Sequence, residues 1–159
     1  MTHEELFDAV IDRALEELRS SELDLFTFAL YHDHEGEAVS VCADTAANSR
    51  RVARDTNAFN MPYFLKEIEA GNLKSAALWE ANVGRSLSLG DFVAINLART
   101  DLPNGPLDDA FYLSMVRSVV KRQSEIAELS KDPKDLVFAA SGPDDEVALV
   151  WALPPDPHN

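Results

Sequence analysis

Apolar residues recur at helical spacing at the start of the chain and again in its last third. Thr2 and Glu5 form a capping-box pattern, and the apolar positions after them predict an amphipathic helix over residues 3–19. Apolar residues three and four apart predict a long core helix over residues 106–130. Pro106 suits the first turn of this helix, where no backbone N–H donor is needed. Each helix has one apolar face, so both must pack against another part of the chain.

The region between these two helices predicts three shorter ones. Asp44 is a favourable N-cap residue, and Pro62 suits a first helical turn. The predicted elements are helices over residues 44–55, 61–70 and 73–83, with a loop at residues 57–60. The first of these helices carries the only basic cluster of the chain. We expect its members to pair with acidic residues near the chain ends, with anion binding as the alternative. They are Arg50, Arg51 and Arg54.

Alternation of apolar and polar residues predicts a first β-hairpin. Residues 23–32 and 37–43 alternate on either side of a turn at residues 33–36. Placing Leu30 opposite Val39 makes one face of the hairpin uniformly apolar. We expect that face to lie on the core.

A second hairpin is predicted near the end of the chain. Residues 136–141 and 146–153 flank a turn at residues 142–145, and we place Ser141 opposite Glu146. Both faces of this pair are apolar. We therefore expect the pair to lie inside the sheet, with cover on both sides.

The predicted fold class is α+β, with an antiparallel sheet built from two β-hairpins and helices packed against it. Residues 92–97 form a short apolar run that suits either a strand or a turn of helix, and we favour the strand. The 159 residues have the size of one ordinary domain and show no linker. We therefore expect a single domain over residues 1–159.

The net charge of −14 is concentrated at the two ends of the chain. Residues 1–44 carry 12 acidic and 2 basic side chains, and residues 136–159 carry 4 acidic side chains and no Lys or Arg. The middle carries 12 of each kind. This segregation predicts a strongly negative surface that attracts a basic partner. The same charge repels phosphates and anionic lipid, so we expect neither a nucleic-acid partner nor membrane binding.

Candidate catalytic chemistry is sparse. The single cysteine, Cys42, excludes an internal disulfide and leaves no cysteine pair for zinc, and its position within a predicted strand suits packing. His32 and His34 are the best candidate metal ligands. We interpret them as solvated turn residues, because zinc needs three or four convergent donors. We assign no catalytic residue, no metal and no cofactor, and we expect a protein that is not an enzyme.

Acidic residues also line one side of the first predicted helix. At helical spacing this stripe falls opposite the apolar positions, and we interpret it as a solvated face. Partner binding and metal binding are the alternatives. The stripe consists of Glu5, Asp8, Asp12 and Glu16.

The acidic turns of the two hairpins are more informative. If both hairpins belong to one sheet, their tips lie along a common edge and add their fields, which speeds association with a cationic partner. The alternative is that acidic residues simply occupy exposed turns and discourage aggregation. We assign Tyr31 and Trp79 as aromatic contacts for such a partner, with core packing as the alternative for each. The acidic residues are Asp33, Glu35, Glu37, Asp144, Asp145 and Glu146.

Parts of the chain resemble a family of small bacterial domains of unknown function. Residues 24–36 read DLFTFALYHDHEG and residues 39–43 read VSVCA, similar to the hairpin with an acidic turn that opens the family. Asp44, Thr45 and Asn48 stand where the family has an Asn- or Thr-containing helix start, and residues 147–151 are similar to its C-terminal strand. Members of this family are suspected to be immunity proteins that neutralise bacterial toxins. The resemblance implies that functional class and no catalytic residues.

Three functional hypotheses follow. The first is a cytoplasmic binding protein, specifically an immunity protein whose acidic surface covers the positively charged cleft of a cognate toxin. The second is an acidic secretion chaperone or adaptor, which would be a stable homodimer with an exposed apolar groove. The third is a metal-assisted enzyme. The lone cysteine and the absence of a signal sequence or apolar span favour the cytoplasm, and the chain is expected to be a monomer or a homodimer.

Overall fold

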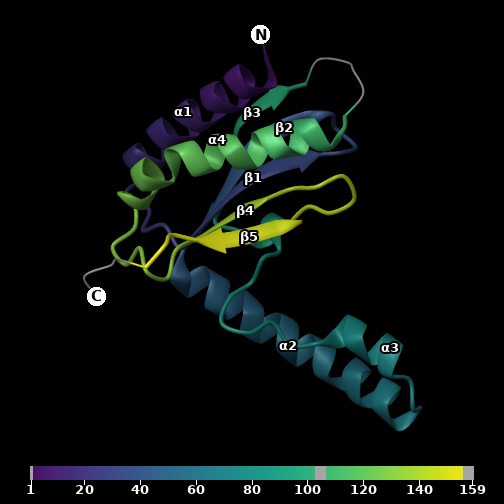
Figure 1. Ribbon diagram of the computed structural model, residues 1–159. Helices are drawn as coiled ribbons and strands as arrows, with labels where there is room; N and C mark the ends of the chain where they lie inside the picture. The colour runs from purple at the N-terminus through teal and green to yellow at the C-terminus, as the bar shows by residue number, and fades with distance from the viewer. Residues whose placement is uncertain (1, 103–106, 156–159) are drawn as a thin grey trace.

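A computed structural model describes residues 2–102 and 107–155 (Figure 1). It has the α+β class that the sequence predicts, with helices and an open five-stranded sheet. The helices are α1 (His3–Ser21), α2 (Ala46–Glu69), α3 (Leu73–Ala76) and α4 (Asp109–Ala127), with short 3-10 turns η1 (Ala77–Trp79) and η2 (Leu89–Asp91). The strands are β1 (Thr27–Asp33), β2 (Ala38–Asp44), β3 (Ala94–Asp101), β4 (Val137–Ala140) and β5 (Leu149–Ala152).

The sheet is mixed, and the prediction of a purely antiparallel sheet is wrong. Its strand order is β3-β2-β1-β4-β5, and β4 lies parallel to β1 while the other neighbours are antiparallel. The reason is the connection through α4. Because β3 and β1 both lie antiparallel to β2, they run the same way, and the helix after β3 carries the chain back before β4 begins. The strand predicted at residues 92–97 is confirmed as β3, although it begins two residues later.

Both hairpins differ from their predicted register by two residues. Leu30 pairs with Val41 instead of Val39, because the first turn lies one residue later, at residues 34–37. In the second hairpin Ala140 pairs with Leu149, so residues 141–148 form the turn and the predicted pairing of Ser141 with Glu146 is wrong. A shift of two residues keeps every side chain on its face of the sheet. The predicted apolar faces are therefore preserved.

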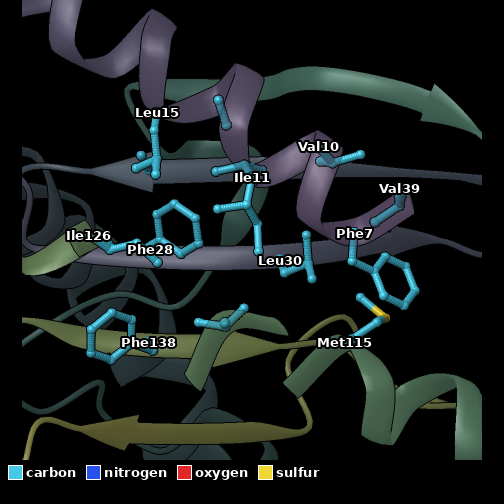
Figure 2. Close-up of a cluster of buried hydrophobic side chains, with 14 of the residues drawn as sticks. Phe7, Val10, Ile11, Leu15, Phe28, Leu30, Val39, Met115, Ile126 and Phe138 are labelled. Carbon is cyan, nitrogen blue, oxygen red and sulfur yellow. The ribbon is translucent and has the colours of Figure 1, made fainter. Parts of the chain in front are cut away.

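The main core lies between the sheet and the helices α1 and α4, which run side by side over one face (Figures 1 and 2). Figure 2 shows side chains from these helices and from the strands converging, and Phe7, Ile11, Phe28 and Phe138 are fully buried. Each such side chain contributes about 1.5–3 kcal/mol by leaving water. The predicted capping box of Thr2 and Glu5 is present at the start of α1. The predicted core helix in the last third is α4, and its expected first residue, Pro106, lies outside the described residues.

The acidic stripe of α1 is largely solvated, as predicted, with Glu5, Asp12 and Glu16 exposed and Asp8 half-buried, but two of its carboxylates also pair with α4. Lys121 Nζ lies 2.7 Å from Asp8 Oδ2, and Arg122 Nη2 lies 2.6 Å from Asp12 Oδ1. These ion pairs join α1 to α4. The negative charge at the centre of α1 is therefore largely offset by cations of the neighbouring helix.

Among the described residues, the arginines of α2 form no ion pair with the acidic ends of the chain, so the predicted pairing is not found there. Arg51 pairs with Asp55 of the same helix at 3.6 Å, and the Arg50 guanidinium lies 5.5 Å from the centre of the Phe26 ring. The cations that reach the acidic ends are others, among them Arg99 and Lys121. Without a direct ion pair, the basic cluster acts on the acidic ends through charge at longer range, as Arg51 does on the buried Asp44.

Helix α2 is continuous, and the predicted loop at residues 57–60 is wrong. Thr45, not Asp44, is its N-cap residue, and Pro62 lies within the helix at an exposed position. With 24 residues α2 is about 36 Å long, whereas a seven-residue strand spans about 23 Å. The second half of α2 therefore projects from the sheet (Figure 1). The helix predicted over residues 73–83 is reduced to α3 and η1, which fold back along this projecting part.

The C-terminal hairpin is less enclosed than the sequence predicted. Strand β4 is buried, but β5 forms the edge of the sheet, and its Leu149 and Val150 are exposed. Cys42 is buried in a smaller cluster on the other face of the sheet, which confirms its packing role. Within the described residues, none of the helices combines the length and the apolar character needed to cross a membrane.

Candidate functional site

The two hairpin turns lie at the same end of the sheet. Strands β1 and β4 are parallel neighbours, so the turns that follow them leave the sheet side by side (Figure 1). His34 Nε2 donates to the carbonyl oxygen of Gly142 at 2.9 Å, and the backbone N–H of His32 donates to Ser141 Oγ at 2.9 Å. Ser141 Oγ in turn donates to the carbonyl oxygen of Glu146 at 2.6 Å. Hydrogen bonds therefore join the turns into one rigid end of the molecule.

All six acidic residues predicted for the turns lie at this end. Asp101 joins them, because it lies opposite Ala38 at the end of β3. The first turn of α4 also belongs here, since Tyr112 Oη lies 3.1 Å from His32 Nδ1, and it adds Asp108 and Asp109. We call the nine residues together the acidic tip surface. They are Asp33, Glu35, Glu37, Asp101, Asp108, Asp109, Asp144, Asp145 and Glu146.

The sequence pattern did not identify three members of this surface, which are Asp101 of β3 and the two acidic residues at the start of α4. Asp108 and Asp109 carried only the signal of a helix start, where acidic residues are favoured in any fold. Asp101 carried no signal that separates it from any other exposed acid. Their place beside the hairpin turns follows from the direction of β3 and α4, which the sequence pattern does not give.

Asp33 organises the first turn. Its Oδ1 accepts hydrogen bonds from the backbone N–H groups of Gly36 at 2.9 Å and Glu35 at 3.2 Å, and its Oδ2 lies 2.8 Å from Arg99 Nη2. These contacts, with the Gly36 bond as the largest cause, hold the pKa of Asp33 below its ordinary value. Asp33 is therefore a fixed carboxylate, partly compensated by Arg99. The other turn carboxylates are exposed.

A hollow of about 230 Å³ opens beside the acidic tip surface, on the face of the sheet away from α1 and α4. We call it the tip cleft. Burial, followed by the charges of Asp33 and Glu146, raises the pKa of Tyr31, so its hydroxyl stays protonated and able to donate. The cleft thus combines an aromatic wall with carboxylates and one arginine. Its lining is Tyr31, Asp33, Cys42, Leu89, Gly90, Ile95, Asn96, Arg99 and Glu146.

The interpretation of His32 as a solvated turn residue is wrong. Its side chain is only 1% exposed, with the Phe111 ring at 5.4 Å and the His34 ring at 4.4 Å between centroids. Burial, with a smaller contribution from His34, lowers the pKa of His32. In the described part of the chain no group of three or more His, Cys, Asp or Glu residues is placed to hold a metal ion. His34 itself is exposed, as predicted.

Trp79 does not join the acidic tip surface. It lies in η1, where its ring stacks on Tyr63 with 4.6 Å between centroids. This ring borders a different hollow, of about 520 Å³, on the projecting part of α2. The structure therefore brings Tyr31 and the six predicted acidic residues together and places Trp79 on a separate surface.

Comparisons of this chain with protein-family models, curated proteins and solved structures find no match. The resemblance to the bacterial domain family therefore stays a prediction. What the geometry can do chemically is bind a cation: exposed carboxylates surround a cleft in which a lysine or arginine side chain would meet Glu146 and the Tyr31 ring.

Proposed function

We propose that this protein binds a basic protein partner through the acidic tip surface, as a toxin-neutralising immunity protein would. The observation that carries the proposal is the junction of the two acidic turns at one end of the sheet, held by the His34–Gly142 and His32–Ser141 hydrogen bonds. Carboxylates from the two hairpin turns, the end of β3 and the start of α4 lie there close together. Their fields add and attract a cationic partner from a distance.

The tip cleft supplies the short-range part of recognition. Interfaces draw most of their affinity from a few side chains in desolvated pockets, and charge mainly sets the association rate. A lysine or arginine of the partner would enter the cleft between Tyr31 and Glu146, while the exposed acids around it remain at a hydrated rim. Because Arg99 already pairs with Asp33, the carboxylate of the cleft that is available to a cation of the partner is that of Glu146.

A neutralisation assay with matched charge reversals tests this proposal. The toxin candidate is the product of the neighbouring gene, expressed together with this chain in a growth assay. Unmodified protein should restore growth, and Glu35→Lys/Asp145→Lys should not, because both side chains are exposed on the acidic tip surface. Glu16→Lys/Glu17→Lys on α1 changes the net charge equally, at exposed positions, and should still restore growth. Equal loss in both variants would contradict recognition by the tip.

The dependence of binding on salt gives a second test with the same partner. Raising the ionic strength shortens the screening length from about 10 Å at 0.1 M to about 3 Å at 1 M, so the association rate should fall steeply. The dissociation rate, which depends on contacts inside the cleft, should change much less. A partner whose association rate is indifferent to salt would contradict electrostatic recognition.

A second candidate function, an acidic secretion chaperone, is favoured by one specific observation. The projecting part of α2 carries an exposed apolar hollow lined by Met61, Phe64 and Trp79, and such a groove is what holds an unfolded segment of another protein. The test is binding of an apolar, unfolded peptide at high salt. Binding that is lost in Met61→Glu and kept in Glu35→Lys/Asp145→Lys would favour the chaperone over the immunity protein.

A further inference from the structure

The projecting part of α2 carries an apolar stripe on the side that the chain after α2 leaves exposed. Its residues follow spacings of three, four and three, which is the spacing of a helix seam that packs against a second helix. Met61, Leu65 and Ile68 are 55%, 48% and 42% exposed. Asn57 lies on the neighbouring face, where it is hydrogen-bonded to Asn82. The seam positions are Ala58, Met61, Leu65 and Ile68.

The helices α3 and η1 cover only one side of this projecting part. Trp79 stacks on Tyr63, yet a hollow of about 520 Å³ stays open between Met61, Phe64 and Trp79. Within residues 56–83, Ala76 is the one residue that is buried. Two short antiparallel segments cannot form a closed core by themselves, so this unit, which we call the arm, leaves its apolar residues facing solvent.

We propose that two copies of this chain form a homodimer through their arms, with the two α2 helices antiparallel. A helix seam of this kind is self-complementary, which is the requirement for a two-fold interface. Charge favours a second copy of the chain as the partner at this surface. Each copy carries a net charge of −14, and residues 56–65 carry no charged side chain. Two copies therefore repel each other least when they meet at this stretch.

Charge also selects the antiparallel arrangement. In an antiparallel pair centred between Met61 and Phe64, Arg54 of one copy lies within one helical turn of Glu69 of the second copy. Both residues are exposed. A parallel pair would place Arg54 beside Arg54 and would also bring the two acidic bodies together at one end. Arg54 of the basic cluster in α2 thereby gains an acidic partner across the dimer, which no ion pair among the described residues of its own chain supplies.

The arm exposes apolar side chains beyond the stripe as well. Phe59 lies on the other side of α2, and the segment after α2 exposes Leu73, Leu78 and Val83 at 78%, 78% and 90%. An exposed apolar surface of this kind on a soluble domain marks a site where another protein surface packs.

Measurement of mass in solution by light scattering and sedimentation tests the dimer. The unmodified chain should have twice its 17.5 kDa, and Leu65→Glu/Ile68→Glu should have 17.5 kDa with an unchanged helical circular dichroism signal. Leu113→Glu/Val120→Glu is the matched control on α4, at 47% and 45% exposure, and should stay dimeric. A single-chain mass for the unmodified protein at micromolar concentration would overturn the proposal.

A charge swap tests the antiparallel arrangement independently of folding. Arg54→Glu and Glu69→Arg should each weaken the dimer about tenfold, because each creates two like-charge contacts. The double variant Arg54→Glu/Glu69→Arg should restore the dissociation constant. Failure of the double variant to recover would overturn the antiparallel arrangement. Neither outcome bears on the acidic tip surface, which lies at the other end of the sheet.

Discussion

At the scale of single residues, buried polar groups hold the acidic turns in place. Ser141 is 3% exposed and bridges the two turns, accepting from His32 N–H and donating to Glu146. His32 is buried against α4 and hydrogen-bonded to Tyr112. Apart from Asp33, which itself organises the first turn, the carboxylates are exposed, and these uncharged contacts decide where they lie.

Replacing Ser141 should therefore loosen the acidic tip surface. Ser141→Ala leaves the buried N–H of His32 without a partner and should lower the free energy of unfolding by about 1–3 kcal/mol. Urea unfolding measures this loss. Ser114→Ala is the control, because the Ser114 hydroxyl bonds only to Ala110 of its own helix at an exposed position, and it should have almost no effect. An equal loss in both variants would contradict the bridging role.

Titration of His32 should make the protein less stable in mild acid. Its pKa is lowered in the folded chain, mainly by burial, so the unfolded chain takes up a proton first as the pH falls below about 6.5. The free energy of unfolding should then decrease from pH 7 to pH 5. His32→Asn keeps an acceptor near the position of Nδ1 and removes the titration. Urea unfolding at the two pH values should show a smaller decrease in this variant, and an unchanged decrease would contradict the assignment.

At the scale of elements, the sequence pattern predicts faces better than it predicts ends and directions. Period-two alternation identifies the core face of β1 and β2 correctly, although the register is wrong by two residues, because such a shift leaves the faces unchanged. Pro62 suggested a helix start, yet at an exposed position α2 tolerates it. Because α2 is longer than the sheet, the arm has no strand to pack against.

The first turn illustrates a local requirement for glycine at the acidic tip surface. A Cβ atom at Gly36 would collide with the Asp33 carboxylate and the Arg99 guanidinium. Gly36→Ala should push the two side chains apart, raise the pKa of Asp33 and lower the free energy of unfolding by up to about 1 kcal/mol, the value of a partly exposed ion pair. Gly90→Ala is the matched control, since nothing lies within 4 Å of its Cβ. Carboxyl NMR titration and urea unfolding check both effects, and an unshifted Asp33 pKa would contradict this account of the turn.

The parallel alignment of β1 and β4 is the feature of the site that could not be predicted. Turn chemistry alone identified Asp33, Glu35 and the acids of residues 144–146 as exposed. Their meeting depends on α4 crossing the sheet, a contact between segments far apart in sequence. For the same reason the acids of β3 and α4 were missed, whereas Trp79 was assigned to the wrong surface because its ring belongs to the arm.

At the scale of the whole molecule, charge is sorted between two ends. Cations of α4 offset the centre of the acidic stripe on α1, and Arg99 compensates one carboxylate of the acidic tip surface, which leaves its other members open. The arm begins at the opposite end, after β2, and its stripe is uncharged. A dimer formed through the arms would keep both acidic tip surfaces accessible to partners.

The central claim, that negative potential is concentrated at the acidic tip surface, is tested most directly by an NMR titration with a short polylysine peptide. The peptide should shift the backbone amide signals of residues 33–37, 142 and 144–146, and these shifts should vanish at high salt. Glu35→Lys/Asp145→Lys should abolish them, while Glu16→Lys/Glu17→Lys should not. Shifts spread evenly over the molecule, or centred on α1, would contradict the account.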